Sequence, residues 1–202
     1  MRIYIPWTEQ TVFALAPDRG SVAEWNGPGA GWTIIGGPAS AIAAGLAEVS
    51  TDTSQTSIYD GTPGDWSQIG GVSEGVFSGN AIYSVDGTGQ VLDQWTGGTS
   101  WQPIFSSTGV WAVTGVGPAV LVVEANGDDS YAYNGTPYSW TQISSSPLFV
   151  AAVSRTNIYG YTNDSTNLDA ADVDVYSGCG TSWTVIGGPA YQNLQGGLAA
   201  GD

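Results

Sequence analysis

The sequence predicts an all-β fold, a five-bladed β-propeller, from three observations. The first is composition: the 202 residues include 30 glycines, and apolar residues occur in short β-branched or aromatic runs. The second is that no long segment has helical periodicity, apart from an Ala-rich piece near Ala41 that Gly45 interrupts. The third is a sequence motif that occurs five times, once for each predicted blade.

The motif reads aromatic-x-Gly, then a tryptophan six or seven residues after the aromatic, then an isoleucine three residues later. Its copies begin at Trp25, Tyr59, Trp95, Tyr133 and Tyr176. Its tryptophans are Trp32, Trp66, Trp101, Trp140 and Trp183, and its isoleucines are Ile35, Ile69, Ile104, Ile143 and Ile186. The steps between tryptophans are 34, 35, 39 and 43 residues, a period typical of a unit that buries its apolar face only by stacking on its own copies.

Turn residues divide each repeat into short strands, as the second repeat illustrates. Glycine, serine and threonine separate it into predicted strands at residues 41–45, 46–51, 56–61 and 66–71. Four antiparallel strands form one propeller blade, and large flat side chains fill the wedge between two twisted blades. We therefore expect the repeated tryptophans to lie in these wedges.

The two ends of the chain predict how the ring closes. Residues 11–20 are similar to the interior strand at 46–52, so the first blade starts part-way through a repeat. Residues 189–202 are similar to residues 38–49, so the chain ends in the first part of a further copy. We expect the C-terminal strand to complete the N-terminal blade, because a closed ring leaves no unpaired inner edge. Residues 1–202 are then a single domain.

Charge and missing residue types exclude several classes of function. The chain has 18 Asp and Glu against three arginines, and a net charge of −15 disfavours nucleic acid and anionic lipid as partners. The absence of histidine and lysine removes the imidazole base, the Ser-His-Asp triad, histidine metal ligands and the Schiff-base lysine. A pair of carboxylates is the remaining way to catalyse hydrolysis, as in glycosidases. The five glutamates share no motif position, however: Glu9, Glu24, Glu48, Glu74 and Glu124. We expect no enzyme activity, no cofactor and no metal.

Three further features lie outside the repeat. Cys179 is the only cysteine, in a Gly-rich turn, and we expect an incidental thiol. The acidic stretch 163–174 has oxygen-bearing residues at alternate positions but lacks the glycine and glutamate of a calcium loop, so we expect a solvated insertion, with calcium binding as the alternative. The N-terminus lacks a signal-peptide pattern and no segment is long enough to cross a bilayer; we expect no membrane insertion and favour a secreted or cell-surface location.

The repeated rings and turn residues favour binding of carbohydrate. Aromatic rings present flat faces that suit the C–H faces of a pyranose, and short polar side chains satisfy its hydroxyls. The candidate contact residues are the motif tryptophans Trp32, Trp66, Trp101, Trp140 and Trp183, with Asn26, Asp60 and Asn134 in the turns. Two alternatives stay open, because blade–blade packing also explains the tryptophans and hairpin-turn chemistry also explains Asn-Gly and Asp-Gly.

The motif also resembles a known family. Tyr-x-Gly-Thr-Pro followed by Trp and then Ile-Gly is similar to the five-bladed propeller lectins of the tachylectin-2 type and, more loosely, to other Trp-rich propeller lectins. The resemblance implies a non-catalytic, multivalent lectin for glycans or glycoconjugates, with N-acetylated sugars as ligands. In that family an acidic or amide residue before the tryptophan helps to hold the sugar. Asp65 fits, and the matching positions otherwise hold Gly31, Ser100, Ser139 and Ser182. The alternative is a structural or protein-binding propeller scaffold with no sugar ligand.

Overall fold

The computed structural model describes residues 12–43, 49–51, 55–78, 81–114, 122–125, 129–145, 148–153, 157–162 and 171–190. These residues form nineteen β-strands and no helix. The all-β prediction is confirmed.

The strands form five antiparallel sheets, each built from strands that are consecutive in the sequence. The first sheet contains β1 (Phe13–Leu15), β2 (Val22–Trp25) and β3 (Trp32–Gly36). The second contains β4 (Ala41–Ala43), β5 (Val49–Thr51), β6 (Thr56–Tyr59) and β7 (Trp66–Gly70). The third contains β8 (Ser73–Ser78), β9 (Ile82–Asp86), β10 (Val91–Gly97) and β11 (Ser100–Ser106).

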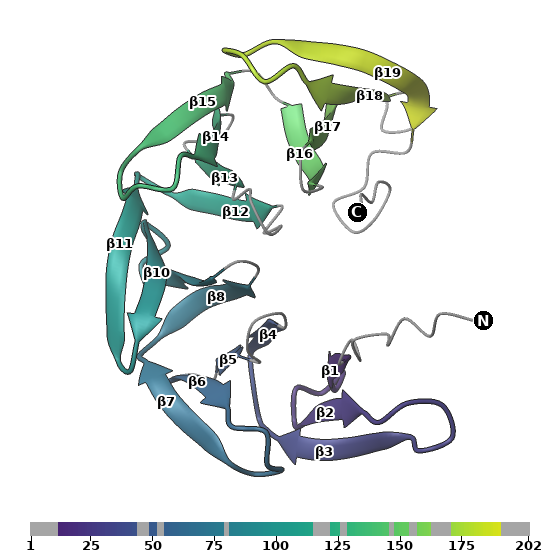
Figure 1. Ribbon diagram of the computed structural model, residues 1–202, viewed down its shortest axis with the longest axis vertical. Coiled ribbons are helices and arrows are strands. Elements are labelled where there is room, and N and C mark those ends of the chain that lie inside the picture. Colours follow the sequence, from purple (N-terminus) through teal and green to yellow (C-terminus); the bar gives the residue numbers. More distant parts are fainter. Residues whose placement is uncertain are drawn as a thin grey trace, which may run out of the picture.

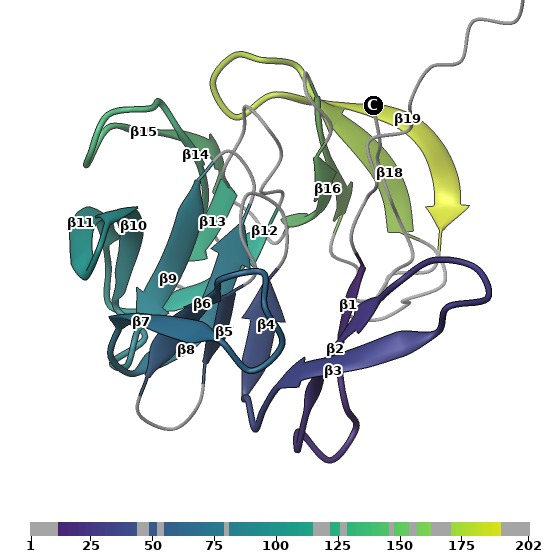
Figure 2. The same cartoon turned by 60° about the horizontal axis from the view of Figure 1, so that its bottom comes forward.

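The fourth sheet contains β12 (Val110–Thr114), β13 (Val122–Ala125), β14 (Asp129–Tyr133) and β15 (Trp140–Ser144). The fifth contains β16 (Leu148–Val153), β17 (Ile158–Thr162), β18 (Ala171–Tyr176) and β19 (Trp183–Ala190). Successive sheets follow an arc around one centre, with β1, β4, β8, β12 and β16 toward the centre and β3, β7, β11, β15 and β19 outside (Figure 1). The view turned by 60° shows the same order of sheets (Figure 2).

The strands predicted for the second repeat correspond to β4–β7, and the motif tryptophans begin or lie in the outer strands, as expected from the repeat. The first sheet differs from the other four because it has three strands among the described residues. The strand predicted to complete it falls within residues 191–202, outside the described part of the chain. The described strands leave the arc open between the first and fifth sheets (Figure 1).

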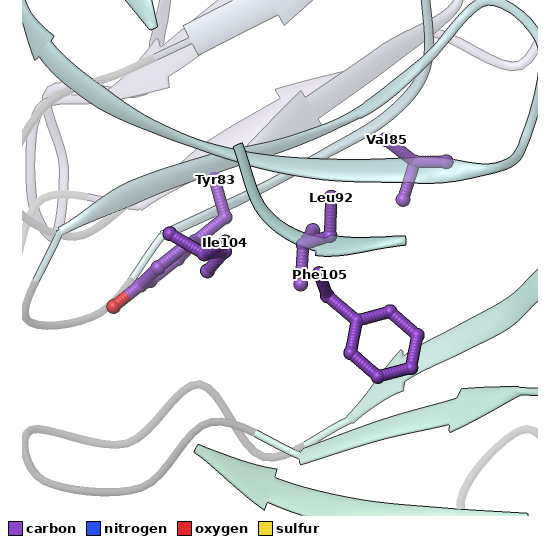
Figure 3. Packing of buried hydrophobic residues seen from close by; sticks show 5 residues of the cluster. All are labelled: Tyr83, Val85, Leu92, Ile104 and Phe105. Atoms are coloured by element: carbon purple, nitrogen blue, oxygen red, sulfur yellow. The ribbon is translucent and has the colours of Figure 1, made fainter. Parts of the chain in front are cut away.

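The hydrophobic core is divided into four clusters, each of which joins two neighbouring sheets. In the largest, Leu92, Ile104 and Phe105 of the third sheet are buried together with Tyr83 and Val85 (Figure 3). Tyr131, Tyr133 and Trp140 of the fourth sheet pack against them. The apolar wedge between sheets that the repeat predicts is therefore the core of the molecule.

Each outer strand carries a β-bulge at its motif isoleucine. In the second sheet the pairing passes from Thr56–Gly70 directly to Ser57–Gln68, which leaves Ile69 without a partner residue. The pairing skips the motif isoleucine in the same way in all five sheets: Ile35, Ile69, Ile104, Ile143 and Ile186. A bulge takes one residue out of the ladder, so the carbonyl of each isoleucine is free to bond outside its own sheet.

Candidate functional site

The predicted site residues lie in or beside the loops that join the last two strands of each sheet. These rim loops are residues 26–31, 60–65, 98–99, 134–139 and 177–182. In four of them the backbone N–H after the motif aromatic donates to the carbonyl before the tryptophan, as in Asp60 N–H to Asp65 O at 3.1 Å; the others are Asn26–Gly31, Asn134–Ser139 and Ser177–Ser182. The loops are therefore similarly closed turns at one repeated place in the fold.

Four motif tryptophans bind the bulged isoleucine of the preceding sheet. The indole N–H of Trp66 donates to the Ile35 carbonyl at 2.8 Å. The same bond, at 2.7 Å, joins Trp101 to Ile69, Trp140 to Ile104 and Trp183 to Ile143. These four rings are partly buried, and their only polar group is used within the fold. They belong to separate wedges and do not come together in one site.

In the first two sheets the residue after the isoleucine is a glycine, which leaves room for the indole ring of the next sheet. We call this position the seat of the ring. A Cβ added to Gly36 would overlap the indole of Trp66, and a Cβ on Gly70 would lie 3.0 Å from Nε1 of Trp101. These glycines are required by close approach of the next sheet. In the third sheet the position holds Phe105 instead, whose ring packs edge-on against Trp140 with centroids 5.0 Å apart.

Trp32 differs from its four counterparts. It begins β3, the outer strand of the first sheet, and its indole N–H has no carbonyl acceptor among the described residues. Its side chain is 50% exposed, although it contacts Trp25 with ring centroids 5.3 Å apart. Of the predicted site tryptophans, Trp32 alone is classed as exposed.

The turn residues form a polar pair that recurs in three rim loops. Asn26 donates through Nδ2 to Thr33 Oγ1 at 2.8 Å and to the Gly31 carbonyl at 3.2 Å. The hydroxyl of Ser67 donates to Asp60 Oδ2 at 2.8 Å. The hydroxyl of Thr141 donates to Asn134 Oδ1 at 3.1 Å. Each pair joins the residue after the motif aromatic to the residue after the motif tryptophan, on the exposed side of the loop.

An aromatic pair lies beside each of these polar pairs. Tyr133 and Trp140 have ring centroids 4.8 Å apart, and Tyr59 and Trp66 have theirs 5.2 Å apart. Burial raises the pKa of Tyr133 above 10.0, so its phenol stays neutral at physiological pH. Asp65 is exposed at the end of its loop, where its N–H donates to the Thr62 carbonyl at 2.8 Å.

Tyr138 is an exposed loop residue that the sequence pattern did not predict as part of a site. This residue is 61% exposed and has a left-handed backbone with φ 63°, which is unusual for a bulky residue. Its N–H donates to the Ile104 carbonyl at 2.9 Å, beside the indole of Trp140. Gly64 holds the same place in the second sheet, with φ 87° and a 2.8 Å bond to the Ile35 carbonyl. Alignment of "GTPGDW" with "GTPYSW" is the signal that marks the substitution.

The remaining sequence predictions concern metal binding, Cys179, the acidic stretch 163–174 and membrane insertion. Within the described ranges, no cluster of three or more His, Cys, Asp or Glu side chains is arranged to hold a metal. Cys179 is exposed in its rim loop. Most of the acidic stretch 163–174, namely residues 163–170, lies outside the described part of the chain. Among the residues described, no helix is suited by length and apolar character to cross a membrane.

Comparison with known proteins gives a fold and no family. No family model matches the sequence, and no curated protein does. Among solved structures, YCF48 bound to a D1 peptide is similar with a TM-score of 0.56 at 15% identity, over 83% of this chain and 61% of that one. This chain thus spans less than two thirds of the length of YCF48.

A variant of the Aleuria aurantia lectin in complex with α-methyl-L-fucoside has a TM-score of 0.42 at 15% identity, over 93% of this chain and 76% of that one. YCF48 is a β-propeller, and at these identities a structural likeness is evidence for the fold alone. The antiparallel sheets, their arrangement around one centre and this likeness together identify the chain as similar to β-propellers.

Proposed function

We propose that the protein is a lectin that binds glycans through its rim loops and catalyses no reaction. The observation that carries the proposal is Tyr138: an exposed ring occupies a left-handed position where the sister loop has glycine. A left-handed backbone costs a non-glycine residue about 1 kcal/mol or more. The N–H bond to the preceding sheet needs only the backbone, since Gly64 makes it too. The tyrosine ring therefore serves a purpose other than the fold.

The surroundings of Tyr138 suit a sugar. Asn134 and Thr141 form the exposed polar pair of the same loop, and Ser139 Oγ accepts a 3.2 Å bond from Asn134 Nδ2. Uncharged amide and hydroxyl groups beside an exposed ring match the alternating hydroxyls and C–H faces of a pyranose. The net charge of −15 also disfavours polyanionic ligands.

Repetition of the loops supports binding at more than one place. The polar pair recurs at Asn26 and Asp60, beside the candidate residues Trp32, Asp65 and Trp66. Shallow sugar sites are individually weak, and several on one rigid body raise avidity by about 10²-fold or more on a surface with many glycans. Asp65 fits the acidic position of the tachylectin-type repeat, and that resemblance implies N-acetylated sugars as ligands. These sugars are therefore the first to test. A secreted or cell-surface location suits such a ligand.

A protein-binding scaffold is the second candidate. The supporting observation is the likeness to YCF48, a propeller whose structure was determined bound to a D1 peptide. An exposed tyrosine also suits a protein interface, where tyrosine is enriched. The two candidates therefore differ in the ligand of the rim loops, which is a glycan in one case and a peptide in the other.

We further propose that residues 1–202 form one domain whose five sheets close into a ring. Four sheets have four strands, and the position beside β1 in the first sheet is unfilled among the described residues. Residues 191–202 are similar in sequence to the segment that includes β4, the innermost strand of the second sheet. The C-terminal segment is therefore the natural fourth strand of the first sheet.

A glycan array followed by calorimetry with N-acetylated sugars tests the lectin proposal. The array is to be probed with the parent protein and with Tyr138→Gly, which restores the residue of the sister loop. We expect binding to multivalent glycans by the parent and a marked loss in the variant, with the far-ultraviolet spectrum and melting curve retained. If the parent binds no glycan, the lectin proposal is wrong and the scaffold takes its place. If Tyr138→Gly binds glycans as well as the parent, the ring of Tyr138 is not part of the site and the proposal loses the observation that carries it.

A further inference from the structure

Neighbouring sheets are joined by one contact that has three parts. An indole N–H donates to the carbonyl of a bulged isoleucine, the isoleucine side chain is buried, and the ring lies over the next residue. The hydrogen bond and the buried isoleucine occur four times, between the first and second sheets and so on to the fourth and fifth. The residue next to the isoleucine that contacts the ring is glycine in the first two cases, Gly36 and Gly70, and Phe105 in the third. The isoleucines of these contacts, Ile35, Ile69, Ile104 and Ile143, are between 0% and 3% exposed.

The two ends of the arc carry the two unmatched halves of this contact. Ile186 of the fifth sheet is bulged in the same register as the other isoleucines, between the pairs Val173–Gly187 and Asp174–Val185. Its side chain is nevertheless 55% exposed. Trp32 of the first sheet is 50% exposed and its indole has no carbonyl acceptor among the described residues. One end has the acceptor and the other has the donor.

The seat for an indole is also present at the acceptor end. Gly187 follows Ile186 as Gly36 follows Ile35 and Gly70 follows Ile69. At Gly36 and Gly70 a Cβ would collide with or press on a tryptophan of the next sheet, whereas at Gly187 it would meet nothing within 4 Å. Glycine is a poor strand residue, and it marks either a bulge, as the one at Ile186 beside it, or close approach of another group, as at Gly36 and Gly70.

We propose that Trp32 packs on Gly187 of its own chain and donates its indole N–H to the Ile186 carbonyl, as a fifth copy of the contact. This joins the first and fifth sheets. It would bury two large apolar side chains that are half exposed in the open arc. Burial of apolar surface is favourable in water, so the contact adds stability to the closed form.

The partner is the same chain and not a second copy for three reasons. The sheets turn around one centre, and their two end faces lie on opposite sides of one opening (Figure 1). Linked surfaces meet at an effective concentration of about millimolar, far above the protein concentrations at which separate copies would associate. Contact between copies would also be head-to-tail, and such contacts extend into filaments when they fail to close.

The inference does not depend on glycan binding at the loop of Tyr138. It removes Trp32 from the candidate ligand residues of the first sheet and assigns it to a wedge. It is also separable from pairing of the C-terminal strand, because the indole contact involves the outer strands β3 and β19 and the strand pairing involves β1. Failure of one does not imply failure of the other.

Hydroxyl-radical footprinting, read residue by residue by mass spectrometry, tests the contact. The parent is to be compared with Gly187→Val, which fills the seat, and with Gly71→Val as a matched control, because a Cβ at Gly71 also meets nothing within 4 Å. A third variant, Gly36→Val, blocks the seat of Trp66 and shows the size of the effect at a known contact.

We expect Trp32 in the parent to be oxidised as slowly as Trp66, and several times faster in Gly187→Val, with Gly71→Val unchanged. Protection of Trp32 should not depend on protein concentration, and the protein should sediment as a monomer. Fast oxidation of Trp32 in the parent, or no effect of Gly187→Val, overturns the proposal. Protection that appears only at high concentration together with oligomers also overturns it, in favour of contact between copies. If Gly187→Val fails to fold, the rate of Trp32 in the parent still decides.

Discussion

Gly64 and Tyr138 occupy the same position in two sister loops, with φ angles of 87° and 63°, and each donates its N–H to the bulged isoleucine of the preceding sheet. In both loops this residue is the third of a local β-turn, which the N–H of Asp65 or Ser139 closes on the carbonyl of Thr62 or Thr136, and such a turn accounts for the left-handed backbone. Only the side chain differs, so glycine and tyrosine can be exchanged between the two loops.

Gly64→Tyr should transfer the exposed ring to the second sheet. A Cβ at Gly64 meets nothing within 4 Å, so the only structural cost is the left-handed backbone, about 1 kcal/mol in the free energy of unfolding. On the lectin proposal the variant gains a ring beside Asp60 and Ser67 and binds multivalent glycans more tightly than the parent. Urea denaturation measures the cost and calorimetry the gain. Unchanged binding by a folded variant would count against the role of the ring.

Replacement of wedge tryptophans by phenylalanine should destabilise the fold unequally. Trp140→Phe removes one donor to the Ile104 carbonyl, which keeps the N–H of Tyr138. Trp101→Phe removes the indole donor to the Ile69 carbonyl. Unlike Ile104, Ile69 receives no backbone N–H from another sheet among the described residues. Loss of one hydrogen bond costs about 1 kcal/mol, and a buried acceptor left unpaired costs up to about 3 kcal/mol.

We therefore expect Trp101→Phe to lower the free energy of unfolding more than Trp140→Phe, as measured by chemical denaturation. Both variants also lose ring area. The difference between their free energies of unfolding therefore measures the cost of leaving the Ile69 carbonyl without a donor from the next sheet. Equal losses would show that the second donor to Ile104 has no energetic role.

Asp93 should lower stability at neutral pH. Burial, together with the nearby charge of Asp86, raises the pKa of Asp93 above 3.8. The folded protein then binds this proton more tightly than the unfolded chain, so stability falls as the pH rises from 3.8 through the folded pKa. Asp93→Asn should stabilise the protein at pH 7 and have little effect below pH 3.8. Melting curves across this range measure the difference.

Asp86→Asn is the control, because its expected effect on stability at pH 7 is opposite in sign to that of Asp93→Asn. Burial acts to raise the pKa of Asp86, but hydrogen bonds from Val91, Thr88 and Gln90 together lower it below 3.8. The stability that it contributes is present above pH 3.8 and is lost as the pH falls through the folded pKa. This variant should be less stable than the parent at pH 7. Shifts of the same sign in both variants would contradict the assignment.

Deletion of residues 193–202 should damage closure of the ring. If this segment pairs beside β1, its removal exposes a strand edge and apolar surface, and aggregation or a broader melting transition follows. Light scattering and calorimetric melting of the truncated chain measure these effects. A truncated protein that stays monomeric and melts as the parent does would refute C-terminal closure while leaving the Trp32–Ile186 contact to be judged by its own footprint.

The sequence by itself determined the strand content and the repeat. Short apolar runs between glycines specify strands locally, and the fixed spacing from aromatic to tryptophan to isoleucine identifies each copy without reference to any partner. It also predicted that the tryptophans lie between sheets, because large flat rings have no other place to be buried in such a unit.

Only the tertiary structure decided which partner each residue of the motif has. The tryptophan and isoleucine of one copy serve different wedges, and the bond from Trp140 reaches Ile104, 36 residues earlier in the chain. The acceptor exists because a bulge takes the isoleucine out of the ladder, and a bulge is defined by pairing with a neighbouring strand. These features depend on contacts between sheets, and local spacing carries no information about them.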